Sequence, residues 1–418
     1  MLAILSTFSV GLVSGMPVAF VLGLCGLAYF LVQEAAPATL ASQLFSALSV
    51  PSLLAIPFFI LAAEIMSRTG ATTRLIRFID SLVGHSRGGL PVVAVIATVL
   101  FSSISGSSVA TAAAIGTILI PEMIQRGYDR TFSVGLIASA GGLGILLPPS
   151  VPLVVYGIIT ETSIATLFTA GAAVGALLSA LLILIAYIYG RMSNVPPQPR
   201  ASRQVRTQAF KQASGVLLSP VIVLGGIYSG YFTPMEAAAI SCLYAIGLAI
   251  GYGIPIKNLF PILTSAAKMS SIIMMILAGA QLFGYALTNE RLPHVLFDFI
   301  MAMDLSPAEF LVGVMLLFLL IGMALEVISV ILITMPILMP MLVGFDINPV
   351  FFGMMLILNM EIAVITPPIG LNLFAISAIS GVPVVRVFKG CLPFVLMLLT
   401  LLAFMAFVPQ VQYAFSLL

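Results

Sequence analysis

Hydroxyl side chains are concentrated in one short segment of an otherwise apolar stretch. Six Ser and Thr residues and a glycine fall within the ten positions 102–111. Each flanking apolar arm has about fifteen residues, roughly 22 Å of helix, which is too short to cross a membrane core. We therefore expect the chain to turn back near Ser105–Gly106 and to present hydroxyl and carbonyl oxygens at membrane depth. Such oxygens suit a hard monovalent cation, although packing of small residues between helices is the alternative.

Two proline pairs interrupt later apolar segments. Pro148-Pro149 ends a segment with three glycines (138–150), and Pro367-Pro368 directly follows Thr366. Proline lacks a backbone donor and clashes with the preceding turn, so an α-helix cannot continue through either pair. A broken helix exposes carbonyl oxygens at one end, which attract a cation, and amide hydrogens at the other, which attract a carboxylate. The sequence thus predicts a ligand at each break; a simple kink is the alternative.

Carboxylates within apolar segments are the remaining candidates. A charged residue at the centre of a membrane helix costs about 2.5–3.5 kcal/mol on insertion scales, so it normally faces a cavity. Glu326 falls at the expected tip of a second hairpin, and we interpret it as a cation ligand or as a residue that shapes the ion site. Glu361, one turn before Thr366, is a second candidate. Three other glutamates lie nearer predicted helix ends and are expected to be solvated: Glu64, Glu161 and Glu236.

The spacing of the prolines indicates an internal duplication. Pro148 comes 27 residues after Pro121, Pro367 comes 27 residues after Pro340, and the two sets are 219 residues apart. The corresponding loops 67–89 and 287–309 carry net charges of +3 and −3. Because positive loops stay in the cytoplasm, opposite signs predict two repeats of inverted topology.

The composition determines the class of protein. Hydrophobic residues make up 61% of the chain and charged residues 7%, against about 25% charged residues in soluble domains. With apolar runs of about 20 residues from end to end, the chain is expected to be an all-α polytopic membrane protein in contact with the lipid bilayer. Neither an HExxH nor a GxSxG motif occurs. We expect no enzyme and no nucleic-acid partner.

One basic linker divides the chain. Residues 191–211 hold five basic residues, no acidic residue and three prolines, so we place them in the cytoplasm. An N-terminal helix over residues 2–31 leads outward from the cytoplasm, and the C-terminus lies outside. The first repeat covers 1–190, with a re-entrant hairpin at about 90–121 and a broken helix at 131–166. The second covers 212–418, with an extra leading helix, a hairpin at about 309–342 and a broken helix at 350–380.

Four motifs resemble one transporter family over essentially the whole chain. They are Ser105–Met123 (SGSSVATAAAIGTILIPEM), Gly142–Gly157 (GLGILLPPSVPLVVYG), Pro336–Pro340 (PILMP) and Thr366–Phe374 (TPPIGLNLF). The chain is similar to the large membrane subunit, or permease, of tripartite ATP-independent periplasmic (TRAP) transporters.

This resemblance implies a partnership and a mechanism. The family pairs the permease with a small four-helix membrane subunit and a soluble periplasmic binding protein. Together they import a small organic anion by sodium symport, usually a carboxylate such as a C4-dicarboxylate, a keto acid or a sugar acid. The implied mechanism is an elevator with scaffold and transport domains, in the inner membrane of a bacterium or archaeon. Sodium is the coupling ion, and no cofactor is implied.

The resemblance also implies site residues. One sodium site would use Ser103, Ser105 and Ser107 with the break at Gly142 and Pro148; the other would use Gly322, Glu326, Thr366 and Gly370. The residues implied at the substrate are Ser105, Gly106, Ser150, Glu326, Ser329 and Asn372. Family members commonly have aspartate in place of Glu326.

Two other functions stay open. One is a stand-alone ion-coupled carrier of dicarboxylates or inorganic anions, which would need no binding protein. The other is an ion channel, which would conduct sodium without substrate.

Overall fold

All regular structure in the part of the chain described here is helical. The computed structural model describes residues 2–33, 36–193, 195–255 and 259–417. Within these ranges, nine segments are long and apolar enough to cross a membrane. The prediction of an all-α polytopic membrane protein is therefore confirmed.

The N-terminal part differs from the expected single helix over residues 2–31. A turn separates two helices there, because Gly15 adopts a φ of +73° and Pro17 precedes the second helix. Residues 67–89, treated above as a loop, contain a helix whose buried Ala71, Leu75 and Ile79 recur every four positions. The elements are α1 (Leu2–Val13), α2 (Val18–Val32), α3 (Pro37–Leu48), η1 (Pro51–Leu54), α4 (Ala55–Arg68) and α5 (Ala71–Val83).

A helix pair and a broken helix follow. The pair α6 (Gly89–Ser105) and α7 (Ser108–Gln125) is joined by two residues, Gly106 and Ser107. The broken helix comprises α8 (Arg130–Gly141), α9 (Leu143–Leu146) and α10 (Val151–Ile159), with the proline pair between the last two. Four long helices come next: α11 (Ile164–Met192), α12 (Arg203–Tyr228), α13 (Pro234–Gly251) and α14 (Leu259–Asn289). The C-terminal half of the basic linker is therefore helical.

The C-terminal part has the same order of elements. A short helix, α15 (Leu292–Met301), occupies the second segment treated above as a loop. The pair α16 (Pro307–Gly322) and α17 (Val327–Gly344) precedes a second broken helix, α18 (Pro349–Val364) and α19 (Leu371–Ser380). The chain ends with α20 (Val384–Phe407) and α21 (Pro409–Ser416).

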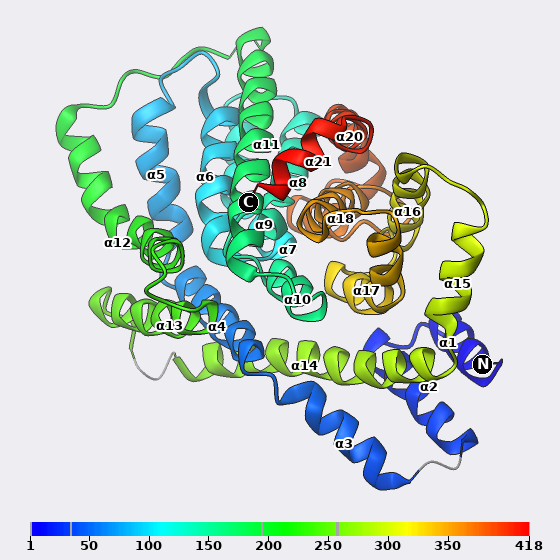
Figure 1. Cartoon of the computed structure of the whole chain (residues 1–418). Coiled ribbons are helices and arrows are strands. Elements are labelled where there is room, and N and C mark those ends of the chain that lie inside the picture. Colours follow the sequence, from blue (N-terminus) through cyan, green and yellow to red (C-terminus); the bar gives the residue numbers. More distant parts are fainter. Residues whose placement is uncertain (1, 34–35, 194, 256–258, 418) are drawn as a thin grey trace.

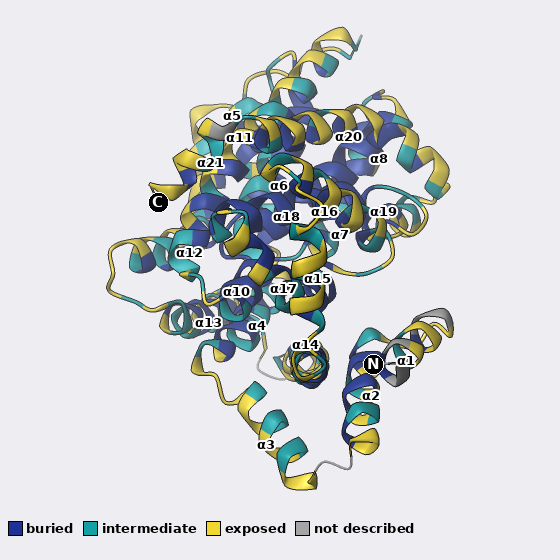
Figure 2. Ribbon diagram, turned by 45° about the vertical axis from the view of Figure 1, so that its right-hand side comes forward, coloured by how far each residue is buried: buried dark blue, intermediate teal, exposed yellow. Residues whose placement is uncertain are grey.

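The helices form two groups. An outer group, α1–α4 with α12–α14, runs along the left and lower edges of Figure 1, and its members pack against one another. An inner group, α6–α11 with α16–α20, fills the centre. Two helices belong to neither group and contact both: α5 contacts α12 and α6, and α15 contacts α14 and α17. The outer helices α4, α12 and α14 also contact the inner group directly. Figure 2 shows that burial is greatest in the inner group, where every residue of α18 after Pro349 is buried.

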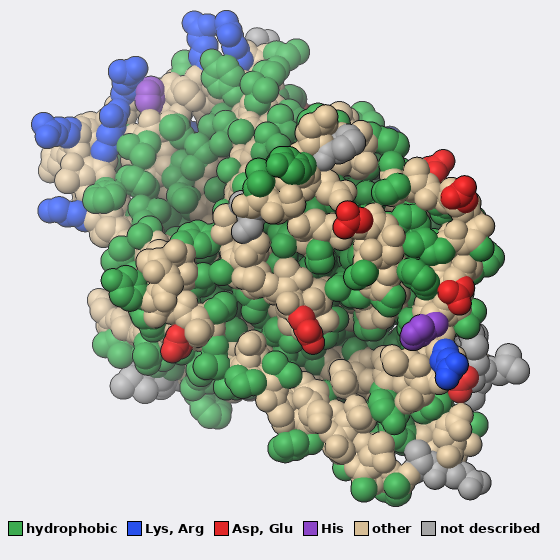
Figure 3. All heavy atoms as spheres, in the orientation of Figure 1, with side chains coloured by type: hydrophobic (Ala, Val, Ile, Leu, Met, Phe, Trp, Pro, Cys, Tyr) green, Lys and Arg blue, Asp and Glu red, His purple; other side chains and the backbone are tan. Residues whose placement is uncertain are grey.

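Charges are segregated on the surface. Figure 3 shows most of the visible Lys and Arg side chains gathered at the upper left, over α5, α11 and α12, with another at the lower right. Most of the visible Asp and Glu side chains lie over the centre and right. Of the basic linker residues, Arg191 lies on α11, and Arg203, Arg206 and Lys211 lie on α12.

Candidate functional site

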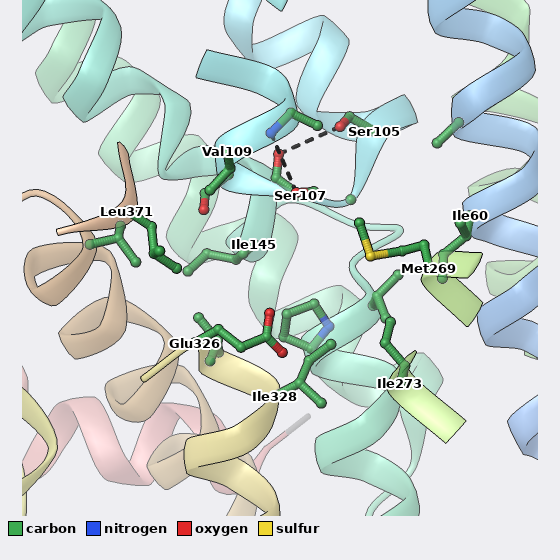
Figure 4. Close-up of a pocket in the computed structure, with 18 of the residues that line it drawn as sticks. Ile60, Ser105, Ser107, Val109, Ile145, Met269, Ile273, Glu326, Ile328 and Leu371 are labelled. Carbon is green, nitrogen blue, oxygen red and sulfur yellow. Dashed lines mark hydrogen bonds between the residues drawn. The ribbon is translucent and has the colours of Figure 1, made fainter. Parts of the chain in front are cut away.

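One cavity of about 210 Å³ lies where the two helix-pair turns and the two helix breaks meet. The turn of the first pair contributes residues 105–110, and that of the second contributes residues 326–328. The first break contributes Ile145, Val151 and Pro152, and the second contributes Val364 and Leu371. Residues of α4 and α14 complete the wall on the side of the outer group. Figure 4 shows this arrangement.

The first turn is fixed by its own hydrogen bonds. The hydroxyl of Ser105 donates to the carbonyl oxygen of Ser107 at 3.5 Å, and the hydroxyl of Ser107 accepts from the amide of Ala110 at 3.5 Å. Gly106 between them has a φ of +63°, which favours glycine. A Cβ on Gly106 would lie 3.1 Å from the carbonyl oxygen of Pro149, so this turn rests on the first break.

The first break is held by a hydrogen bond within its own segment. Both proline pairs, Pro148-Pro149 and Pro367-Pro368, are cis. Ser150 is fully buried, and its hydroxyl donates to the carbonyl oxygen of Ile145 at 2.5 Å. The α10 helix begins directly afterwards, and its first two residues, Val151 and Pro152, line the cavity.

Glu326 is the charged group of the second turn. It is the N-cap residue of α17, but its side chain makes no capping hydrogen bond. Its carboxylate points into the cavity, toward the side on which Ser107 and Ile145 lie (Figure 4). No Lys or Arg in the described part of the chain forms an ion pair with it. The carboxylate is thus available to a ligand.

The second break is tied to both halves of the chain. The amide of Gly370 donates to the carbonyl oxygen of Met323 in the second turn at 3.3 Å. The side-chain amide of Asn372 donates to the carbonyl oxygen of Ala138 on α8 at 3.0 Å. Thr366 uses its hydroxyl within its own helix, donating to the carbonyl oxygen of Ile362 at 2.7 Å. This break therefore connects the second turn to the first broken helix.

The structure brings some of the expected site residues together at the cavity. Four line it: Ser105, Gly106, Ser107 and Glu326. Nine others lie in the helices around it, outside its lining: Ser103, Gly142, Pro148, Ser150, Gly322, Ser329, Thr366, Gly370 and Asn372. Their roles as ligands stay predictions.

Sequence reasoning missed the wall formed by the outer group. Ile60, Ala63, Glu64 and Ser67 share one face of α4, and Met269 and Ile273 share one face of α14. Glu64, expected at a solvated helix end, instead lines the cavity and accepts a hydrogen bond from the Ser265 hydroxyl at 3.1 Å. The spacing of three and four residues was the available signal.

The cavity has an unusual charge balance for an anion site. Two carboxylates line it, and none of the described residues in its wall is Lys, Arg or His. The described ranges also contain no cluster of three His, Cys, Asp or Glu residues. The available ligands are hydroxyls, backbone groups and carboxylates, which suit a hard cation better than a transition metal.

Comparison with known proteins identifies the family. A family model described as "Tripartite ATP-independent periplasmic transporter, DctM component" matches residues 5–411. The chain belongs to this family. The resemblance to the TRAP permease subunit is thereby confirmed, and with it the expectation of a transporter subunit rather than an enzyme.

Two curated relatives are similar to this TRAP permease over nearly their whole length. The C4-dicarboxylate TRAP transporter large permease protein DctM of Pseudomonas aeruginosa is 40% identical over 396 residues, or 94% of this chain and 93% of the relative. The sialic acid TRAP transporter large permease protein SiaM of Vibrio cholerae is 36% identical over 402 residues, which cover 96% of this chain and 94% of the relative. The two relatives are named for different acids.

A solved structure supports the fold of the TRAP permease. MtrF of Neisseria gonorrhoeae superposes with a TM-score of 0.62 at 14% identity, covering 88% of this chain and 82% of that one. At this identity the likeness concerns the architecture alone. The permease thus has the fold of a multi-pass membrane transporter, and TRAP permeases belong in the inner membrane.

Proposed function

We propose that this permease imports a small organic anion together with sodium. The observation that carries the proposal is the charge balance of the cavity. Glu64 has an ion-pair partner in Arg68 outside the wall, at 4.0 Å, whereas Glu326 has none among the described residues. An anion that enters beside the unpaired Glu326 carboxylate needs a cation next to it. Oxygen-rich turns and helix breaks around the cavity are suitable ligands for that cation. Substrate and ion then stabilise each other, which is the physical basis of symport.

The substrate belongs to the carboxylates. The relatives named for a C4-dicarboxylate and for sialic acid support this class, which includes keto acids and sugar acids. The backbone amide of Val151 at the start of α10 and the turn at Ser105–Gly106 are the proposed partners of the carboxylate.

Two partners complete the proposed transporter. The family description is tripartite and periplasmic, which supports a soluble binding protein that delivers the anion and a separate small four-helix membrane subunit. The outer group of helices is the proposed contact of the small subunit. Its exposed apolar side chains, such as Phe45 on α3 and Phe260 on α14, are consistent with burial in lipid or against a membrane partner.

The proposed movement is that of an elevator. The inner group of helices contains both turns and both breaks, so it could carry substrate and ions as one body. The outer group supplies only the wall formed by α4 and α14. The helices α5 and α15, which touch both groups, would be the connections that bend. The matching order of elements in the two halves supports inverted repeats.

Uptake into proteoliposomes tests the function. They would hold this chain with its cognate small subunit, an inward sodium gradient, and labelled C4-dicarboxylates, keto acids or sialic acid, with and without the binding protein. Uptake that requires both sodium and the binding protein is the expected result. Sodium-driven uptake without the binding protein would indicate a stand-alone carrier, and sodium current without substrate would indicate a channel.

A further inference from the structure

Glu361 is a fully buried carboxylate without a hydrogen-bond donor. Its exposed fraction is 0%, and neither carboxylate oxygen has a partner among the described residues. None of the ion pairs in the described ranges includes it. Burial without a partner disfavours the ionised form of this carboxylate, so Glu361 carries a charge only where a compensating positive group lies next to it.

Other buried oxygens without a hydrogen-bond partner among the described residues lie near the first break, around residues 138–144. The carboxylate of Glu361 lies over Gly142, where a Cβ would be 2.5 Å from its Oε1 atom. Thr111 Oγ1 lies 2.9 Å from the position of a Cβ on Gly144. Asn372 is held against Ala138 by its amide nitrogen, which leaves its Oδ1 atom without a donor. The buried oxygens without partners on or beside residues 138–144 are those of Thr111, Ser139, Glu361 and Asn372.

Neutral oxygens can ligate a cation at this depth, but they do not cancel its charge. The sodium site expected at the first break uses three serines, Gly142 and Pro148, none of which is charged. A cation there would leave a net positive charge in a low-dielectric region, just as Glu361 alone leaves a negative one. Because Glu361 lies directly against Gly142, each charge is positioned to compensate for the other.

We propose that Glu361 supplies the counter-charge for the cation bound at the first helix break. The inference rests on the proposed sodium coupling and adds a residue from the second half of the chain to a site otherwise built by the first half. Glu361 acts here as a positioning and charge-balancing residue, beside the ion's ligands. Its ion is a hard monovalent cation, because the surrounding groups are hydroxyl, amide and carbonyl oxygens.

Thermal unfolding of the purified chain in detergent tests this role without transport. An ion that binds the folded protein and not the unfolded chain raises Tm. The melting temperature would be measured in sodium chloride and in choline chloride at equal ionic strength, for the wild type and for Glu361→Gln. We expect the variant to need roughly tenfold more sodium, or more still, for half of the full Tm increase. We also expect its Tm in choline to exceed that of the wild type, because the unpaired charge is gone.

The outcomes separate this inference from the proposed function. If the wild type shows no sodium-specific increase in Tm, sodium coupling itself is contradicted. If the wild type responds and Glu361→Gln responds at the same sodium concentrations, the role of Glu361 is contradicted while sodium coupling stands. If the role of Glu361 were purely structural, Glu361→Gln would lower Tm in both salts and leave the sodium response unchanged, which would also contradict the proposal.

Two further variants complete the design. Glu161→Gln removes an exposed carboxylate and should leave both the Tm and its sodium response unchanged. If Glu361→Gln does not fold, Glu361→Asp decides, because it keeps the charge but withdraws it from Gly142. A weaker sodium response in Glu361→Asp supports the proposal, and an unchanged response overturns it.

Discussion

The carbonyl oxygen of Ser107 lies against Gly144, closer than any side-chain carbon at that position would permit. The contact joins the first helix-pair turn to the four-residue helix α9 of the first break. Backbone meets backbone here, so the geometry of the turn depends on the absence of a Cβ at Gly144.

Gly144→Ala is therefore expected to displace the turn at Ser107. Overpacking of this kind costs about 1–3 kcal/mol, and we expect transport to fall by roughly tenfold or more. Sodium-driven uptake and Tm measure the two effects. The control is Gly313→Ala on α16, where a Cβ would have nothing within 4 Å. Equal uptake by Gly144→Ala and the wild type would contradict the importance of this contact.

Gly106→Ala should impair transport beyond its effect on stability. A left-handed conformation costs an alanine about 1–2 kcal/mol, and Gly106 has a φ of +63°. Gly230 has a φ of +74° with open space around it, so Gly230→Ala carries the same backbone cost away from the cavity. We expect Gly106→Ala to lose more stability than Gly230→Ala, because its Cβ would also lie 3.1 Å from the carbonyl oxygen of Pro149, and we expect only Gly106→Ala to lose uptake. Similar uptake by the two variants would show that the conformation of the Gly106 turn is not required for transport.

Glu326→Gln should weaken the dependence of uptake on sodium. Its carboxylate points into the cavity and has no basic partner in the described ranges, so loss of the charge removes attraction for a cation. The sodium concentration for half-maximal uptake should rise by roughly tenfold, while Glu326→Asp should retain most of the wild-type response. An unchanged sodium response in Glu326→Gln would exclude Glu326 from the ion site.

Arg126→Ala should destabilise the fold, and more so at high pH. Arg126, at the end of α7, pairs with Glu122 and lies 3.9 Å from Asp80 on α5. Burial raises the pKa of the Asp80 carboxyl, and Arg126 opposes that rise. Without Arg126 this native-state pKa rises further above its unfolded value, so stability is lost as the pH increases through that range.

The expected loss is about 1–2 kcal/mol at neutral pH, because both side chains are partly solvated. Thermal unfolding should show a larger loss at pH 8 than at pH 5. Arg191→Ala, which removes an exposed arginine without an ion pair in the described ranges, is the control. A loss that is the same at both pH values would show that Asp80 is not the group concerned.

The basic linker should lie in the cytoplasm and the C-terminus outside. The five basic residues of 191–211 determine this orientation. Reporter fusions active on one side of the membrane would be placed after residue 200 and after residue 418. The reverse pattern would contradict the inverted repeats, because the extra helix before the second repeat is predicted to reverse the orientation of that repeat in the membrane.

Local signals in the sequence were sufficient for the turns and breaks. Gly106 within a run of hydroxyls marked the first turn, and the proline pairs marked both breaks, because these residues restrict the backbone whatever surrounds them. The separation of α1 and α2 had the same kind of signal in Gly15 and Pro17, although it was overlooked in favour of the continuous apolar run.

Contacts between distant segments could not be derived from one sequence. The position of Glu64 on the cavity wall depends on how α4 packs against the inner group. The contact between Glu361 and Gly142 depends on the packing of two broken helices from opposite halves of the chain. Hydrophobic periodicity identifies a buried face but does not name its neighbour.

The contact between Glu361 and Gly142 can form only late in the synthesis of the chain. Glu361 is made 219 residues after Gly142. At roughly 5–20 residues per second, about 11–44 s separate their emergence from the ribosome. Throughout that interval the first break, with its glycines and buried hydroxyls, lacks the helices that later enclose it. The first break can therefore reach its final packing only after α18, α19 and α20, which contact it, have been made.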